Sequence, residues 1–278
     1  MTYLFTFTDI YQSLIRELNF KNVKSLVKKI SFYFLTTHIF ISLVAVALAL
    51  ETAIVLQQPF QDTSLYLFIF TSTHFAYNVY YVKKSRLYRV VSVISLIANL
   101  GVIFFVPAVY YVKLLFIAIA SGIYIFPVFF SFKKDKSFSF QKLLLLIFIW
   151  VSTTFVLPAS DINYDFDTMV MLLYRIVLLS SVTLLFFIRD EKIENIKQKA
   201  IAANYVLAVL HIAVAVITLF SAHGLISAVY LFISILCFFL VVRFLNKKFA
   251  SVYYLAYVDG IMFLQSIMII LLYFLKVL

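Results

Sequence analysis

Two carboxylates four residues apart are the first feature of the sequence that suggests chemistry. On a continuing helix Asp190 and Glu194 lie on the same face, one turn apart. Such a pair suits Mg²⁺, which takes oxygen ligands and is often bound by one or two carboxylates together with substrate phosphates. The alternative is a solvated helix end, at which the acids pair with nearby basic residues, namely Arg189, Lys192 and Lys197. The spacing taken alone favours this alternative.

Charged side chains inside long apolar segments are costly and therefore informative. At a rise of about 1.5 Å per residue, Glu51 and Arg175 lie ~9 Å and ~12 Å from the same end of the predicted helices, and Lys113 has a comparable depth. We expect Glu51 to pair with Arg175 or Lys113 in the protein interior. The pair either fixes the register of the helices or belongs to a path for a substrate or a proton.

A second polar layer is predicted near the opposite helix ends. It contains His38, His74, Asn78 and Asp259, at depths of ~6–13 Å. Four such groups on three helices suggest a cavity that opens to the cytoplasm. The alternative is that each side chain binds a neighbouring carbonyl or hydroxyl, and we favour it for the two histidines. An unpaired carboxylate at Asp259 stays protonated or needs a cation.

The elements that position these residues are membrane-spanning helices. Hydrophobic residues make up 65% of the chain and charged residues 13%, with a mean hydropathy of +1.07. Soluble domains average roughly 45–50% apolar and about 25% charged residues. The apolar runs are about twenty residues long and lack the alternation of barrel strands. The single cysteine, Cys237, allows no intramolecular disulfide.

Nine spans follow an N-terminal amphipathic segment in this interpretation. Residues 9–30 combine an apolar stripe with a basic face and predict an interfacial helix, so we divide the chain into an interfacial segment (1–30) and one membrane domain (31–278). The predicted all-α membrane bundle has spans at 31–57, 64–82, 89–106, 108–130, 141–158, 167–188, 200–220, 224–245 and 251–277. The tightest predicted turn is at Pro107.

Basic residues give the predicted spans an orientation. Twenty of the 23 lysines and arginines fall in five segments that a nine-span chain places on one face: 16–29, 83–89, 133–142, 189–199 and 243–248. The opposite connections carry the acidic residues Asp62, Asp161, Asp165 and Asp167. The positive-inside rule makes the basic face cytoplasmic, with the N-terminus inside and the C-terminus outside. This distribution explains the net charge of +11 without a nucleic-acid partner.

A nine-helix membrane protein with an acidic pair after its sixth span resembles the UbiA superfamily of intramembrane prenyltransferases. That family carries an Asn-Asp-x-x-Asp-x-x-x-Asp motif at the end of span 2 and an Asp-x-x-x-Asp motif after span 6. Both bind Mg²⁺ and the diphosphate of a prenyl donor. The segment from Tyr124 to Pro127, with Lys133 and Lys134 after it, is similar to the family's basic segment. Three further segments resemble a divergent UbiA-like branch found in Bacteroidetes. They are Tyr77-Asn78, Ile188-Arg189-Asp190 and Tyr257-Val258-Asp259-Gly260.

The resemblance implies roles for individual residues. Asp190 and Glu194 would hold Mg²⁺, and Asn78 would orient a diphosphate bound by basic residues, namely Lys83, Arg86, Lys133, Lys134 and Arg189. The cavity would contain His38, His74, Tyr124 and Asp259. Alignment of Asn78 with the motif's asparagine, however, places Val79, Val82 and Arg86 where the family has aspartates.

Three functions follow from these observations. The first is transfer of a prenyl group from a polyprenyl diphosphate to an aromatic or lipid acceptor. The second is a catalytically degenerate relative that binds an isoprenoid or another lipid, or serves as a membrane partner subunit. The third, an unrelated transporter, ranks last because no inverted repeat is visible. The expected location is the bacterial inner (plasma) membrane, with the lipid bilayer as a partner; protein partners are not indicated.

Overall fold

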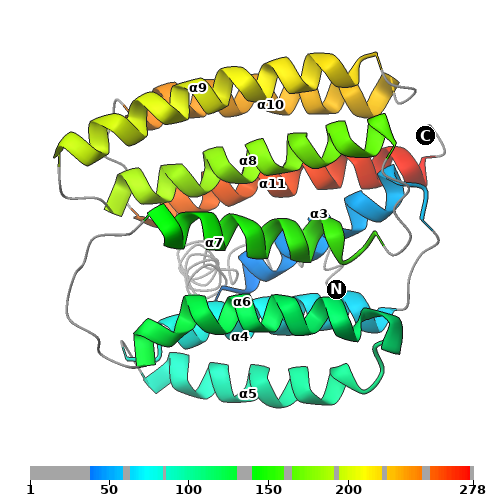
Figure 1. The fold of residues 1–278 in the computed structure, drawn as a ribbon, viewed down its shortest axis with the longest axis vertical. Coiled ribbons are helices and arrows are strands. Elements are labelled where there is room, and N and C mark those ends of the chain that lie inside the picture. The colour runs from blue at the N-terminus through cyan, green and yellow to red at the C-terminus, as the bar shows by residue number, and fades with distance from the viewer. Residues whose placement is uncertain are drawn as a thin grey trace, which may run out of the picture.

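The computed structural model describes residues 38–58, 63–83, 86–129, 140–159, 165–190, 194–220, 224–245 and 251–275. Within these ranges every regular element is a helix, and the helices run side by side across the view of Figure 1. The α-helices are α3 (Ile39–Val55), α4 (Thr63–Tyr80), α5 (Arg86–Ile103), α6 (Tyr111–Phe129), α7 (Phe140–Val151), α8 (Phe166–Asp190), α9 (Glu194–Thr218), α10 (Gly224–Leu245) and α11 (Ser251–Phe274).

Each of the nine predicted spans coincides with one of the α-helices in the described residues. Among the described residues, five helices (α5, α6 with the preceding η1 turn, α8, α9 and α10) are long and apolar enough to cross a membrane by length and composition. The segments Ile39–Val55, Gln141–Val156 and Val258–Phe274 are apolar but shorter. The all-helical membrane bundle is therefore confirmed. The predicted interfacial segment, residues 1–30, lies outside the described residues.

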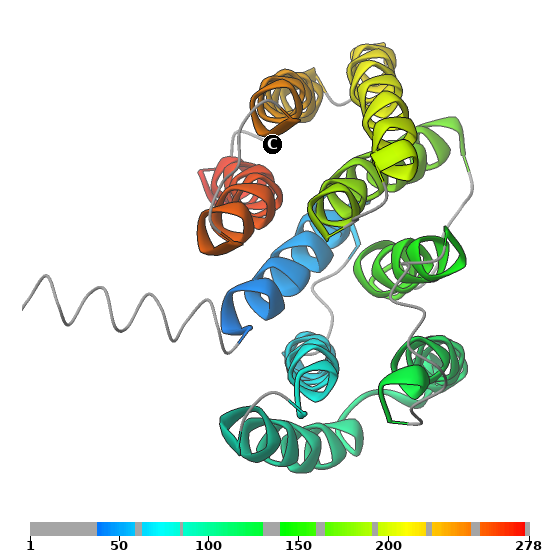
Figure 2. The ribbon, with the colours of Figure 1, turned by 90° about the vertical axis from the view of Figure 1, so that its left-hand side faces the viewer.

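The exposed side chains of α5 show that the bundle is built for lipid. Only Ser92 and Ser95 of this helix are buried, whereas apolar residues such as Ile94 and Ile97 are more than 60% exposed. A soluble protein rarely leaves a contiguous surface of this kind uncovered. In Figure 2, which looks along the helices, α5 lies at the edge of the bundle and α3 near its middle. The helix α3 packs against α4 on one side and α11 on the other, so it connects these two helices in the core.

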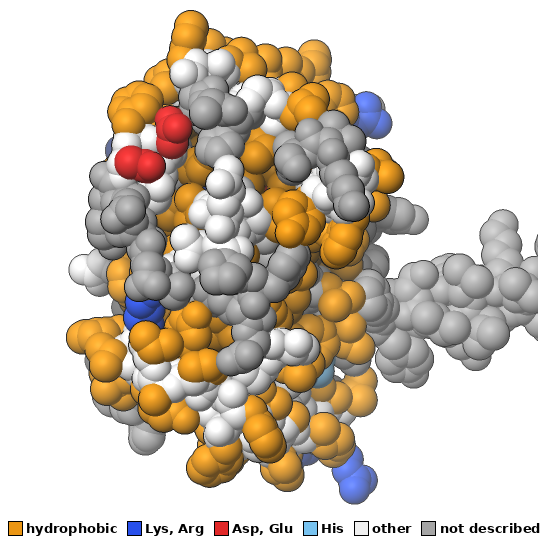
Figure 3. All heavy atoms as spheres, turned by 90° about the vertical axis from the view of Figure 1, so that its right-hand side faces the viewer, with side chains coloured by type: hydrophobic (Ala, Val, Ile, Leu, Met, Phe, Trp, Pro, Cys, Tyr) orange, Lys and Arg blue, Asp and Glu red, His pale blue; other side chains and the backbone are white. Residues whose placement is uncertain are grey.

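The helix ends that carry basic residues gather at one end of the bundle. There α4, α8 and α10 end and α5 and α9 begin, on the left of Figure 1. We name this the basic end; its described basic residues are Lys83, Arg86, Arg89, Lys142, Arg189, Lys197, Lys199 and Arg243. The opposite end, where α8 begins with Asp165 and Asp167, is named the acidic end. Figure 3 shows its acidic side chains on a mostly apolar surface.

Two local departures from α-helix are found near the acidic end. Pro107 precedes a 3₁₀ turn, η1 (Ala108–Tyr110), that leads into α6, so the predicted tight turn is present. The helix α7 continues as a π-helical turn, η2 (Ser152–Val156), in which the Leu157 amide donates to the Ser152 carbonyl at 2.8 Å. The Thr52 hydroxyl donates to the Thr154 carbonyl at 2.8 Å, which ties this wider turn to α3.

Candidate functional site

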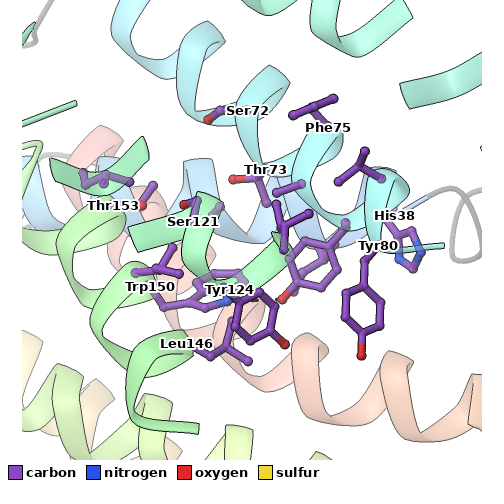
Figure 4. Close-up of a pocket in the computed structure, with 18 of the residues that line it drawn as sticks. His38, Ser72, Thr73, Phe75, Tyr80, Ser121, Tyr124, Leu146, Trp150 and Thr153 are labelled. Atoms are coloured by element: carbon purple, nitrogen blue, oxygen red, sulfur yellow. Dashed lines mark hydrogen bonds between the residues drawn. The ribbon is translucent and has the colours of Figure 1, made fainter. Parts of the chain in front are cut away.

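A cavity of about 650 Å³ lies among α3, α4, α6, α7 and α8, with further contributions from Asn99 of α5 and Asp259 of α11 (Figure 4). Leu114 and Ile125, eleven residues apart on α6, both line it, so it extends for ~17 Å along that helix. The lining toward the acidic end includes the apolar residues Ala45, Leu114 and Leu157, together with the polar residues Asn99 and Thr153. We name this mostly apolar part of the cavity the slot.

Aromatic side chains surround the cavity toward the basic end. The rings of Tyr80 and Tyr124 are stacked with centroids 6.2 Å apart. The Trp150 indole packs edge-on against Tyr77, and its Nε1 donates a hydrogen bond of 3.2 Å to the Tyr77 hydroxyl. These four residues all line the cavity. Aromatic rings with a polar atom suit a place at which an apolar slot meets a polar opening.

His38 forms a second aromatic contact at the same end. It directly precedes α3 with a φ of 62°, in the left-handed region that non-glycine residues rarely adopt. Its ring stacks on Tyr81, with centroids 5.0 Å apart and an interplanar angle of 13°. This stacking and the hydrogen bond that its carbonyl accepts from the Ser42 hydroxyl at 2.9 Å help to hold the unusual backbone conformation.

Two charged side chains complete the lining. Arg189 lies in the last turn of α8, with its guanidinium 5.3 Å from the centroid of the Phe186 ring. Asp259 of α11 is 2% exposed, and its Oδ1 has no hydrogen-bond partner among the described residues. The cavity therefore combines an apolar slot with an end that carries both a cation and a carboxyl group. Such a space suits an amphiphile with one hydrocarbon tail and a polar head.

The structure brings four of the predicted residues into this cavity: His38, Tyr124, Arg189 and Asp259. His74 and Asn78 do not belong to its lining. His74 Nδ1 lies 2.7 Å from the Ser95 hydroxyl, and the Asn78 side-chain amide donates to the His74 carbonyl at 2.8 Å. These contacts match the alternative considered for His74, in which a neighbouring hydroxyl is the partner.

The predicted diphosphate-binding residues are mostly outside the cavity. Lys83 and Arg86 are exposed and do not line it, and Lys133 and Lys134 lie outside the described residues. Arg189 is the member of this set that the structure places in the lining. One sequence signal could have distinguished Arg189 from the other predicted diphosphate-binding residues. Arg189 lies in the last turn of a long apolar helix.

The predicted metal pair needs a correction. The helix α8 ends at Asp190 and α9 begins at Glu194, so the two residues lie on different helices and not one turn apart on one helix. The Glu194 carboxylate is exposed and accepts a hydrogen bond of 2.6 Å from Gln198. The described residues contain no group of three or more His, Cys, Asp or Glu that could hold a metal ion. These donors alone do not form a magnesium site, and Mg²⁺ stays a prediction because the Asp190 side chain is not described.

A separate polar cluster lies in the core near the acidic end. Arg175 Nη2 lies 3.0 Å from Glu51 Oε1, and both side chains are buried. The same carboxylate accepts hydrogen bonds from Tyr230 (3.1 Å), Gln265 (2.7 Å) and Ser266 (2.7 Å). The structure thus pairs Glu51 with Arg175, the first of the two partners expected.

Lys113, the other expected partner of Glu51, binds elsewhere. Its ammonium donates to the carbonyls of Val156 and Ala159 at 3.3 and 3.0 Å, next to the π-helical turn. The residues that complete the Glu51 cluster, Tyr230, Gln265 and Ser266, were not predicted. Neutral polar side chains in apolar helices give a weak sequence signal, although Gln265 and Ser266 are adjacent in α11.

Comparison with known proteins finds no match to this chain among protein-family models, curated proteins or solved structures.

Proposed function

We propose that this integral membrane protein binds an isoprenoid or a similar single-tailed lipid in the cavity. The observation that carries the proposal is the shape and polarity of that space. A slot extends for ~17 Å along α6, and aromatic residues, Arg189 and Asp259 line its basic end. Its volume of about 650 Å³ lies within the ~300–1,000 Å³ typical of ligand sites.

The route into the cavity supports a lipid ligand. Ala118 and Gly122 of α6 line the cavity, and both residues are exposed. A Cβ added at Gly122 would meet no atom within 4 Å, so there is open space beside this residue. The proposal is that a tail enters sideways from the bilayer along this part of α6, without first crossing water.

A photoreactive isoprenoid tests the proposal. Geranylgeraniol that carries a diazirine on its tail is expected to crosslink to peptides of α4, α6 and α7 in protein reconstituted in nanodiscs. Excess unlabelled geranylgeraniol removes this signal because both compete for one site. Crosslinking confined to the exposed residues of α9, or insensitive to the competitor, contradicts a specific site and indicates bulk contact with lipid.

Prenyl transfer is the second candidate, and one observation favours it. The end of α4 (Tyr80 and Tyr81) and the end of α8 (Phe187 and Arg189) line the same cavity, as the resemblance to UbiA prenyltransferases implies for spans 2 and 6. Transfer releases diphosphate from a prenyl diphosphate, whereas binding alone leaves the donor intact. Assay of diphosphate release in the reconstituted protein therefore separates the two functions.

The proposal includes nine membrane spans, with the basic end in the cytoplasm of a bacterial cell and the C-terminus outside. Cys237 is the only cysteine and is buried, so it can be replaced by alanine to give a background without thiols. In that background Asp165→Cys is expected to react with a membrane-impermeant maleimide in intact cells. Lys199→Cys is expected to react only after permeabilisation; the reverse pattern would invert the orientation.

A further inference from the structure

Asp259 presents an unused hydrogen-bond acceptor to the cavity. The residue is 2% exposed, it lines the cavity, and its Oδ1 has no partner among the described residues. The great majority of buried polar side-chain atoms have a partner in the protein or in ordered water. A buried acceptor that faces a ligand-sized space therefore points to a group on the ligand.

Tyr77 supplies a donor to the same space. Its hydroxyl accepts the hydrogen bond from Trp150 Nε1 at 3.2 Å and so keeps its own proton to donate. Tyr77 also lines the cavity, and it lies close enough to Asp259 for the two groups to interact electrostatically. One end of the slot thus offers both a donor and an acceptor. A hydroxyl group is matched to this pair because it both accepts and donates a hydrogen bond.

We propose that the Tyr77 and Asp259 side chains bind the hydroxyl head of a long-chain isoprenoid alcohol, whose tail lies in the slot. The alcohol donates its O–H to Asp259 Oδ1, and the Tyr77 hydroxyl donates to the alcohol oxygen. This inference rests on the proposed lipid-binding function and names its head group. Arg189 of α8 lines the same end of the cavity and interacts electrostatically with Asp259.

The head group distinguishes this ligand from a prenyl diphosphate. A diphosphate has no proton to donate to Asp259 Oδ1 when it is fully ionised. A methyl ether of the same alcohol keeps the oxygen acceptor but lacks the O–H donor. The alcohol, its methyl ether and the diphosphate share one geranylgeranyl tail. Differences in their affinity therefore report hydrogen bonding of the head group and not binding of the tail.

Equilibrium binding of these three probes to the purified full-length chain is the test. The methyl ether is expected to bind about tenfold more weakly than geranylgeraniol, since it leaves the Asp259 acceptor unmatched. In Asp259→Leu the alcohol is expected to bind as weakly as the ether, whereas Asp259→Asn, which keeps an acceptor of similar shape, retains most of the preference. Asp167→Leu, at the acidic end, is the matched control and is expected to leave the preference unchanged.

The outcomes separate failure of the inference from failure of the proposed function. Equal binding of alcohol and ether to the wild-type chain, or tighter binding of the diphosphate, overturns the hydroxyl site while lipid binding stands. Absence of binding by all three probes overturns the proposed function itself. If Asp259→Leu does not fold, the wild-type comparison and Asp259→Asn still decide the question.

Discussion

Replacement of Glu51 by leucine is expected to lower the free energy of unfolding by about 3–5 kcal/mol. The substitution leaves the Arg175 guanidinium buried without its carboxylate partner, which lies 3.0 Å away in the wild-type chain. It also removes the acceptor of the hydrogen bonds from Tyr230, Gln265 and Ser266. Equilibrium unfolding in mixed micelles, with increasing fractions of a denaturing detergent, measures the change.

The size of this effect follows from the number of helices that the cluster joins. Glu51 belongs to α3, Arg175 to α8, Tyr230 to α10 and Gln265 to α11. Arg175 further donates to the Thr52 hydroxyl at 3.3 Å, so the pair is enclosed by polar partners on several sides. Removal of one member exposes the others to an apolar interior, where unmatched polar groups are costly.

Two further variants make the first prediction specific. The double substitution Glu51→Leu/Arg175→Leu is expected to recover part of the lost stability, because it removes the unpaired charge as well. Glu194→Leu is the control, since this glutamate is exposed at the start of α9. Ordinary surface substitutions change the free energy of unfolding by no more than about 0.5 kcal/mol. A change this small in Glu51→Leu would show that the Glu51 cluster does not stabilise the fold.

The second large effect is expected in the cavity, where Gly122→Leu should weaken isoprenoid binding. Gly122 lines the slot, and a Cβ added there meets nothing within 4 Å, so the leucine side chain extends into open space. A bound tail must then be displaced or compressed. Overpacking of this kind typically costs about 1–3 kcal/mol, which corresponds to an affinity loss of about five- to a hundredfold.

The chain provides a closely matched control for this substitution. Gly101 of α5 is also a helical glycine with no atom within 4 Å of an added Cβ, but it does not line the cavity. Gly101→Leu is therefore expected to leave isoprenoid affinity unchanged, while helix propensity changes equally in both variants. Equal loss of affinity in the two variants would mean that binding depends on the glycines in general rather than on the slot.

The helices could be predicted from the sequence because each long apolar run is a local signal. Backbone groups in lipid must be satisfied within the segment, so a run of about twenty apolar residues has few alternatives to a helix. Positions of the lysines and arginines correctly indicated which helix ends gather together. The π-helical turn at Ser152–Val156 was not predicted, because it depends on a bond from Thr52 on another helix.

The candidate site could be predicted only in part. The depths of Glu51 and Arg175 indicated a pairing, since two opposite charges at one level of an apolar interior have a strong reason to meet. Packing between helices that are distant in the sequence decides the other features of the site. It determines which face of α4 borders the cavity, and it places His74 against Ser95 and not in the cavity lining. The sequence predicted a connection between the spans 167–188 and 200–220, but it did not predict that α9 begins as early as Glu194.

The most direct test of lipid binding uses Trp150, the only tryptophan of the chain and part of the cavity wall. Geranylgeraniol with bromine on its tail quenches a tryptophan that it touches. Titration of the purified protein in unbrominated detergent should give saturable quenching that unbrominated geranylgeraniol reverses and that is much weaker in Gly122→Leu. Quenching that rises linearly without saturation, or that persists with the competitor, would contradict a lipid-binding cavity.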